Sequence, residues 1–346
     1  MSKNDFIDFL KTKSPSGYEK DASNWLIEKY SSDLQTGKDV LGNTYGMVKN
    51  ISPKTIMIEG HIDEIGGQIL HITDDGFIIF RENGGLDKAS LISQKVQFMN
   101  GIVGIIGKQT LHIEKPEERK EIKEIEDLWI DCGFKNKKEA LKNVDIGDFF
   151  TFMPNAVELN NNLICSKGID DKIGAYIAFE VAKKLKQSNY KNYEIYAVGT
   201  TQEEVGGFGA SAVSYNFKPF ICISIDVEFA SDMPNSNKNR LGEIKLGDGL
   251  VIKRNTDTNP ILFDYFKNYC KKHKLKHQIS ATAWDGGGTN ASLIKHQREG
   301  IATIDIGVPN RYMHTSNEVV SWNDVESGID MLVKIIKSIP KDFKFN

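Results

Sequence analysis

Cysteine is scarce in this sequence, and its four cysteines are scattered along the chain. No two of them form a C-x-x-C pair, so neither a zinc-finger framework nor a thioredoxin-like redox motif is expected. Cys165 and Cys222 lie in apolar runs, which is typical of core residues. The absence of a disulfide framework predicts a reducing, cytoplasmic compartment.

Long apolar runs and an excess of one charge are also absent. No run approaches the roughly 18–20 apolar residues that a membrane-spanning helix needs. The first twenty residues alternate acidic and basic side chains, unlike the basic-then-apolar pattern of a signal peptide. The formal net charge of -3 at pH 7 provides no general attraction to nucleic acids or anionic membranes. We therefore expect neither of them as a partner.

Several common catalytic signatures are missing as well. The sequence contains no His-Glu-x-x-His, no G-x-S-x-G and no Walker A loop. What it does contain is ordinary for a globular protein, with 40% hydrophobic and 26% charged residues. Its 346 residues suit roughly two domains.

Helices and strands alternate after residue 170. Helical periodicity is found at 170–187, 207–217, 259–275 and 322–339, and strand-like apolar runs are found at 193–200, 220–228 and 302–308. Such alternation predicts an α/β sandwich built on a mixed sheet. Residues 1–64 have the same αβ character, so we assign them to the same domain.

The segment 65–163 differs from its surroundings. It holds many short β-rich runs punctuated by glycines, with little helical signal, which favours a small barrel or sandwich, and we predict a barrel-like domain. We therefore predict a discontinuous catalytic domain of residues 1–64 and 164–346, interrupted by an inserted β-rich domain at 65–163. Domain insertion of this kind is tolerated where two chain ends lie close together at a surface loop.

Six residues of metal-ligand type stand at or beside the ends of strand-like runs. Because ligands collect at the carboxyl ends of strands in open α/β sheets, we expect these side chains to share one crevice. Two imidazoles and four carboxylates suit a pair of divalent cations with oxygen and nitrogen ligands, which predicts a metal-dependent hydrolase. The six are His61, Asp170, Glu203, Glu204, Asp226 and His314.

Each of these residues, taken alone, also has a purely structural interpretation. His61 could be a structural histidine. It could also be a metal ligand whose second ring nitrogen is bound by the carboxylate of Asp63. Aspartates such as Asp170 commonly cap helices. Asp226 suits a strand-end aspartate bonded to loop amides, and His314 alone is ambiguous. The prediction of a metal site depends on the occurrence of all six residues together.

The adjacent glutamates Glu203 and Glu204 also have two interpretations. An isolated Glu-Glu pair is usually a solvated turn, but this one follows a strongly apolar run and therefore ends a strand. Two neighbouring carboxylates at such a place can divide the work of catalysis. One binds a metal, and the other takes a proton from the attacking water.

Five segments in this order resemble the M42 family of metallo-aminopeptidases, which includes glutamyl aminopeptidases and tetrahedral (TET) peptidases. Some members of that family have carried the label endoglucanase. The resemblance spans nearly the whole chain, and the β-rich segment is similar to the family's dimerisation domain. The segments are HIDEIG at 61–66, GIDDKIG at 168–174, TTQEEVGGFGA at 200–210, SIDVEFASDMP at 224–234 and VPNRYMHTSNEV at 308–319.

The resemblance implies an activity and a cofactor. It implies an aminopeptidase that removes N-terminal residues from short peptides by means of a water activated by two divalent metals. Zinc suits the mixed ligand set, and cobalt or manganese could substitute. It also implies peptide substrates and a closed homo-oligomer, most simply a dodecamer.

It further implies a role for each matching residue. His61 would bind one metal, oriented by Asp63, and Asp170 would bridge both metals with Asp171 in support. Glu203 would be the general base. The remaining metal ligands would be Glu204, Asp226 and His314. Glu204 and Asp226 would bind different metals.

Two departures from the family pattern affect no proposed ligand. The family often has arginine where this chain has Lys172, and aspartate where it has Asn290. Either change could alter substrate binding or a contact between subunits. Residues 235–240 and 284–290 are expected to line the specificity pocket.

Two other functions remain open from the sequence. A glycoside hydrolase would need two carboxylates across a sugar site and no metal, and the pairing of carboxylates with His61 and His314 argues against it. A metal-binding assembly subunit without activity is the third possibility. Glu203 argues against an inactive subunit, because its proposed role is catalytic and involves no metal binding.

Overall fold

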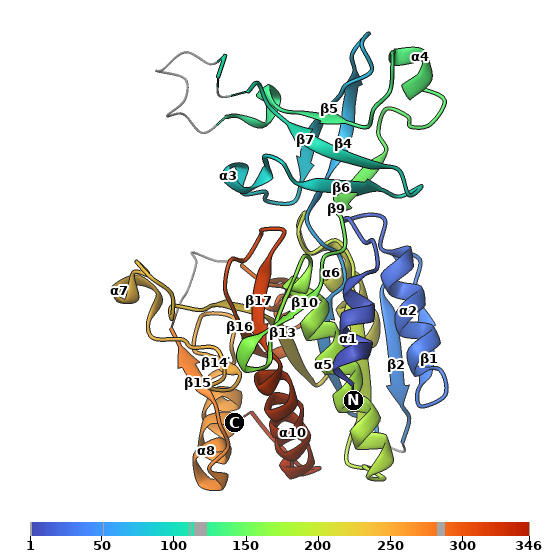
Figure 1. Ribbon diagram of the computed structural model, residues 1–346. Coiled ribbons are helices and arrows are strands. Elements are labelled where there is room, and N and C mark those ends of the chain that lie inside the picture. The colour runs from blue at the N-terminus through green and yellow to red at the C-terminus, as the bar shows by residue number, and fades with distance from the viewer. Residues whose placement is uncertain (1, 51, 111, 114–122, 282–287, 346) are drawn as a thin grey trace.

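A computed structural model describes residues 2–50, 52–110, 112–113, 123–281 and 288–345 (Figure 1). Within them lies an eight-stranded mixed sheet with the order β1-β2-β12-β3-β13-β16-β14-β15. Its neighbours β12, β3, β13 and β16 are all parallel, so their carboxyl ends meet at one edge. The strands are β1 (Gln35–Lys38), β2 (Thr44–Val48), β3 (Thr55–His61), β12 (Glu194–Thr200), β13 (Ile221–Phe229), β14 (Val251–Lys253), β15 (Gln278–Ser280) and β16 (Ala302–Asn310).

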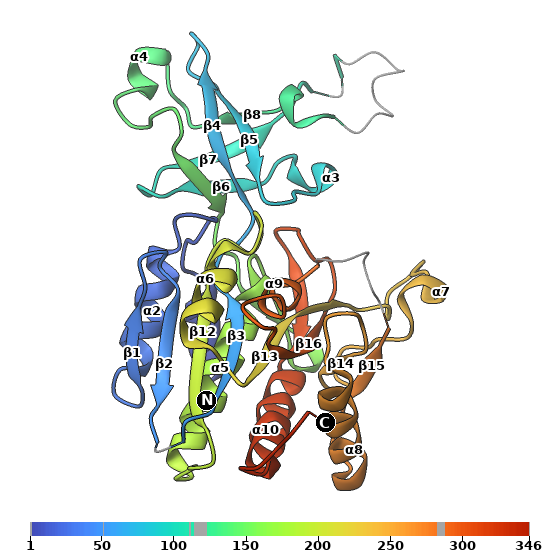
Figure 2. The ribbon, with the colours of Figure 1, turned by 180° about the vertical axis from the view of Figure 1, so that it is seen from behind.

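Helices cover both faces of this sheet. One face packs against α1 (Lys3–Leu10), α2 (Lys20–Tyr30), α5 (Ile169–Gln187), α8 (Pro260–His273) and α10 (Trp322–Ser338). The other carries α6 (Phe208–Phe217) and α9 (Asn290–Ile294), which Figure 2 shows from that side. The central strand β13 is therefore buried on both faces along nearly its whole length, including its polar residues Ser224, Asp226 and Glu228. The remaining short helices are α3 (Lys88–Leu91), α4 (Lys137–Ala140) and α7 (Lys238–Leu241).

The predicted α/β sandwich is confirmed, and so is the small inserted barrel. Six strands close into an antiparallel barrel in the order β4-β5-β8-β7-β6-β9, with Phe80, Phe98 and Phe150 in its core. The barrel lies beyond the end of the sheet at the top of Figure 1. Its strands are β4 (Gly66–Ile72), β5 (Ile78–Asn83), β6 (Lys95–Phe98), β7 (Val103–Gly107), β8 (Trp129–Asp131) and β9 (Phe149–Phe152).

A smaller antiparallel sheet joins the return from the barrel to the rest of the chain. It consists of β10 (Val157–Leu159), β11 (Leu163–Ser166) and β17 (Glu318–Ser321), with β11 in the middle. This pairing places the start of α5 beside the start of β17. Of the two cysteines expected in the core, Cys222 is buried and Cys165 is half-buried. Among the described residues, no helix has the length and apolar character to cross a membrane.

Candidate metal centre

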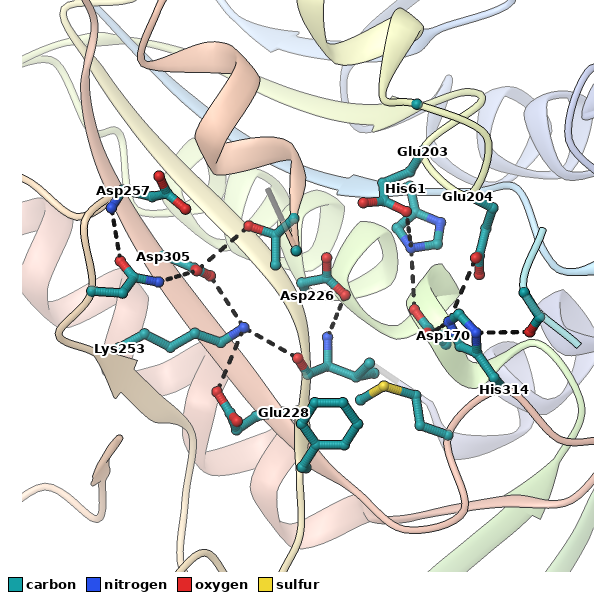
Figure 3. Close-up of a pocket in the computed structure, with 18 of the residues that line it drawn as sticks. His61, Asp170, Glu203, Glu204, Asp226, Glu228, Lys253, Asp257, Asp305 and His314 are labelled. Atoms are coloured by element: carbon teal, nitrogen blue, oxygen red, sulfur yellow. Dashed lines mark hydrogen bonds and ion pairs between the residues drawn. The ribbon is translucent and has the colours of Figure 1, made fainter. Parts of the chain in front are cut away.

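All six candidate ligands converge at the carboxyl edge of the sheet. They line one pocket of about 630 Å³, shown in Figure 3. His61 ends β3, Asp226 lies within β13, and Asp170 stands at the start of α5. Glu203 and Glu204 follow β12, and His314 follows β16. The sequence prediction that these side chains share one crevice is confirmed.

Asp170 lies between the two imidazoles. Its Oδ1 is 3.1 Å from Nε2 of His61, and its Oδ2 is 3.3 Å from Nε2 of His314. The same Nε2 of His314 is 3.5 Å from Oε2 of Glu204. Each oxygen of Asp170 therefore faces a different histidine.

Two overlapping groups of side chains could hold a metal ion. One consists of His61, Asp170 and Glu204, and the other of His61, Asp171 and Asp226. Within each group, one ligand atom per residue can be chosen so that all lie within 4.8 Å of one another. Nitrogen and carboxylate oxygen donors in such groups suit zinc and related divalent ions.

Asp63 holds the histidine and the glutamate turn in place. Nδ1 of His61 lies 3.1 Å from the Asp63 carbonyl oxygen and 3.3 Å from its Oδ1. The Asp63 carboxylate also accepts the backbone N–H groups of Glu203 at 3.0 Å and Glu204 at 3.2 Å. Ser16 donates its hydroxyl to the same carboxylate at 2.7 Å. Asp63 therefore links β3 to the loop after β12.

Asp171 is buried and contacts the backbone beside the site. Its Oδ2 accepts the N–H of His61 at 3.1 Å, and its Oδ1 accepts the N–H of Gly174 at 3.0 Å. The peptide bond between Asp170 and Asp171 is cis. One aspartate of this pair thus faces the pocket while the other binds backbone amides near the start of α5.

Two further contacts were not found by sequence reasoning. Glu318 of β17 accepts the N–H of Asp170 and the N–H of His314, each at 3.0 Å. The carbonyl of Gly85 accepts the Nδ1–H of His314 at 2.9 Å, so the segment after β5 reaches the site from the barrel. Glu318 is the first residue of β17 and stands directly before two valines. A carboxylate beside this apolar pair was the only signal that the sequence offered.

Burial and crowding shift the ionisation of these groups. Burial disfavours the charged form of Asp170, but hydrogen bonds from His314 and His61 hold its pKa well below its usual range. Burial and the Asp170 charge raise the pKa values of Glu204 and Asp226 well above normal. The cluster holds more carboxylates than cations to compensate them, and buried charges of that kind need a counter-charge.

Glu203 differs from its neighbour in exposure and surroundings. Its side chain is 18% exposed, whereas that of Glu204 is 4% exposed. Burial raises the pKa of Glu203 to about 7, although the positive charge of His61 opposes this shift. Its Oε2 lies 3.9 Å from Nε2 of His61, beyond hydrogen-bond distance.

The pocket extends away from the metal-type residues toward a second group of charged side chains. This group comprises Glu228 of β13, Lys253 of β14 and Asp305 of β16, each at most 5% exposed. Figure 3 shows Asp226 between the two groups. None of the described residues 235–240 lines the pocket, so that expectation was wrong.

The predicted segment 284–290 contributes in part. Gly288 and Thr289 line the pocket, while residues 284–287 lie outside the described ranges. Sequence reasoning missed Lys253 and Asp305, because each lies in a strand-like apolar context with no ligand spacing to mark it.

Known proteins share both the sequence pattern and the fold. The sequence profile described as M42 glutamyl aminopeptidase matches residues 42–331. Lysyl aminopeptidase of Pyrococcus furiosus is 29% identical over 350 residues, covering 96% of this chain and 96% of the relative. The TET aminopeptidase of a marine sediment Thaumarchaeota archaeon superposes with a TM-score of 0.92 at 27% identity, covering 97% and 96% of the two chains.

The TET1 peptidase of Pyrococcus horikoshii gives a TM-score of 0.85 at 28% identity, covering 98% of this chain and 99% of its own. It is described as assembling into a tetrahedron or a large octahedral shell, and PhTET1-12s is described as a dodecamer. The profile match covers well over half of the chain. This chain therefore belongs to the M42 peptidase family and is a peptide-hydrolysing enzyme.

Proposed function

We propose that this enzyme is a dinuclear metal-dependent aminopeptidase that removes N-terminal residues from short peptides. The observation that carries the proposal is the position of Asp170, with one carboxylate oxygen toward each of two histidines. Buried carboxylates outnumber the neighbouring cations, and a pair of divalent ions would compensate them. The residues present therefore fit such ions.

The proposed division of the ligands between two ions rests on the family resemblance. In it Asp170 is shared, His61 and Asp226 serve one ion, and Glu204 and His314 serve the other. His61 and Asp226 do fall in one candidate group, and Nε2 of His314 lies 3.5 Å from Oε2 of Glu204, but the other candidate group places His61 with Glu204. Zinc suits these donors, and cobalt or manganese could replace it. Bound ions would supply a water of lowered pKa and a polarised substrate carbonyl.

Glu203 is the proposed general base. Its carboxylate lines the pocket, and its backbone N–H is fixed by Asp63. In that role it accepts the proton of the attacking water and delivers it to the leaving amine. Its side chain is 18% exposed, whereas that of the more buried Glu204 is 4% exposed, so Glu203 is the more accessible of the two from the pocket.

Exo-action from the N-terminus fits the proposed ions. A bound ion could receive the free α-amine of a peptide as a ligand, and an internal peptide bond lacks that group. The family does not fix the side chain that is removed. Its profile is described by glutamyl activity, while the Pyrococcus furiosus relative is named for lysyl activity.

We further propose that residues 65–163 form a separate dimerisation domain, that dimers assemble into a closed dodecamer, and that the enzyme works in the cytoplasm. The closed barrel within this segment and the assemblies described for the TET relatives support the first two points. Enclosure would restrict substrates to unfolded peptides. Light scattering at several protein concentrations tests this, because a fully active monomer would contradict the assembly and leave the metal chemistry intact.

The proposed chemistry is tested by Glu203→Gln with Glu204→Gln as its matched control. We expect Glu203→Gln to keep wild-type metal content and to lose about 10²–10⁴-fold in kcat, the usual worth of a general base. Glu204→Gln should lose bound metal. Elemental analysis and rates on peptide anilides are measured on the same samples. Near-wild-type turnover by metal-loaded Glu203→Gln would remove Glu203 from the base role.

A glycoside hydrolase or an inactive assembly subunit is not favoured by any observation at the site. The same samples distinguish them. Hydrolysis of a soluble glucan that survives a chelator would indicate the glycosidase, and bound metal without any turnover in the wild-type protein would indicate the assembly subunit.

A further inference from the structure

The inserted barrel reaches the proposed metal centre through the connection between β5 and β6. This connection, residues 84–94, includes α3 and is here called the barrel arm. A Cβ added to Gly84 would lie 3.3 Å from Cβ of Glu204. One added to Gly85 would lie 3.2 Å from Nδ1 of His314. The start of the arm thus packs against the two side chains that are proposed to bind the same ion.

The barrel arm also binds the loop that carries His314, once at each end of the arm. The carbonyl of Gly85 accepts the Nδ1–H of His314 at 2.9 Å. Oε1 of Gln94 accepts the hydroxyl of Ser316 at 2.9 Å, and Ser316 is 2% exposed. Between these two contacts, Leu91 is fully buried in the barrel core. The arm is therefore anchored in the barrel and holds the loop from there.

The two histidines of the site differ in what binds the ring nitrogen that faces away from the pocket. Nδ1 of His61 lies 3.1 Å from the carbonyl of Asp63, within the proposed catalytic domain. Nδ1 of His314 is bound by the barrel arm instead. Because a carbonyl oxygen can only accept, this bond places the proton on Nδ1 and fixes the direction of the ring. Nε2 of His314 then points at Asp170 and Glu204, at 3.3 and 3.5 Å.

We propose that the barrel arm is a positioning element for the proposed metal ligand His314. The carbonyl of Gly85 orients the imidazole, and Gln94 holds the loop that carries it. This inference rests on the proposed dinuclear function. It makes one of the two ions dependent on the barrel although the barrel supplies no ligand. The other ion, at His61, should not depend on the arm.

The first test measures zinc affinity by competition with a chromophoric chelator. In Gly85→Ala the added methyl group must displace the His314 ring, so we expect the affinity for one of the two zinc ions to fall about 10–100-fold. The affinity for the other ion should stay unchanged. Gln94→Ala should weaken the same ion by a smaller factor. Gln94→Glu keeps an acceptor for Ser316 and should restore the wild-type affinity.

The matched control is Lys13→Met. It removes another bond between the two parts of the chain, from Nζ of Lys13 to the carbonyl of Met99 at 2.8 Å, which does not involve the His314 loop. Both zinc affinities should remain at wild-type values in this variant. Urea denaturation checks that each variant is folded, and Gln94→Ala decides the test if Gly85→Ala is not. Unchanged affinities in the folded arm variants, or equal weakening of both ions, would overturn the proposal.

Hydrogen exchange in the full-length protein without metal separates this proposal from the proposed function. The N–H of His314 donates to Glu318 at 3.0 Å, and its exchange is followed by mass spectrometry on the peptide that contains it. Gly85→Ala and Gln94→Ala should speed this exchange about two- to tenfold, as expected for the loss of one hydrogen bond, and Lys13→Met should not. Such a result supports the positioning role even if the protein binds fewer than two ions. Unchanged exchange in both arm variants would overturn it even if the enzyme proves to be a dinuclear aminopeptidase.

Discussion

Two clusters of buried charge lie beside each other at the start of α5, and they differ in almost every physical respect. The first is the site cluster of His61, Asp170, Glu203, Glu204, Asp226 and His314. The second, here called the lysine cluster, consists of Glu64, Lys167 and Lys172, whose side chains are at most 1% exposed. Nζ of Lys167 lies 2.6 and 2.7 Å from the two oxygens of Glu64. Both lysines also donate to the carbonyl of Thr12.

Buried charge alone does not identify a catalytic site. The lysine cluster finds its partners within the protein and lines no part of the pocket, so it connects the residues after α1 to the starts of β4 and α5. Each cluster has more groups of one charge than of the other, but only the site cluster faces a cavity. Perturbed charge beside open space is what indicates chemistry.

Metal removal should act on the site cluster alone and gives the largest expected effect. A chelator should reduce turnover at least about 10³-fold, because bound ions supply several kcal/mol of transition-state stabilisation. Zinc, cobalt or manganese should restore it. The measurement is kcat against metal content by elemental analysis. Full activity in protein shown to contain no metal would contradict the metal-binding role of the site cluster, which is what distinguishes it from the lysine cluster.

Glu64→Gln should act on the lysine cluster. It leaves two buried ammonium groups without their carboxylate, so we expect a loss of about 3–5 kcal/mol in the free energy of unfolding. Lys167→Met is the matched control, because Lys172 and Glu64 remain a simple pair at 3.2 Å, and it should cost less. Urea denaturation measures both. Equal losses would contradict this description of the lysine cluster.

The site was predictable from sequence because its residues follow strongly periodic runs. His61 and the Glu203–Glu204 pair each follow an apolar strand, and parallel strands bring such ends together without any knowledge of register. The long helices were predictable for the same reason. The three-residue strands β14 and β15 are too short to carry a pattern. Lys253 meets Asp305 only because β14 pairs antiparallel with β16, which no local signal reveals.

The two departures from the family pattern acquire a physical explanation. Lys172 belongs to the lysine cluster. Asn290 is 2% exposed, and its side-chain amide donates to Glu59 at 3.0 Å and to Thr200 at 2.9 Å. Both residues therefore act below the pocket, through packing of α5 and α9 on the sheet. Their burial is a property of the tertiary structure that their sequence neighbours do not indicate.

The lysine cluster also predicts a pH dependence of stability. Burial lowers the pKa of Lys167 to about 7, with Lys172 acting in the same direction and Glu64 opposing it. The folded chain then binds fewer protons than the unfolded chain above that pH, so this group makes stability rise up to the normal lysine pKa of about 10.4. The rise is at most about 1.4 kcal/mol per pH unit. Denaturation from pH 7 to 9 should show a flatter profile for Lys167→Met, and parallel profiles would contradict it.

The smallest effects are expected at two histidines of the inserted segment. His71 in β4 and His112 are both exposed, and among the described residues neither belongs to a group of three or more His, Cys, Asp or Glu side chains that could hold a metal. We expect His71→Ala and His112→Ala to keep full metal content and rate, with stability changed by less than about 0.5 kcal/mol. His314→Ala provides the contrast, because it removes a proposed ligand and should lower metal content. Loss of metal from either barrel variant while the fold survives would place ligand function inside residues 65–163. The proposed division between a catalytic domain and a dimerisation domain would then be wrong.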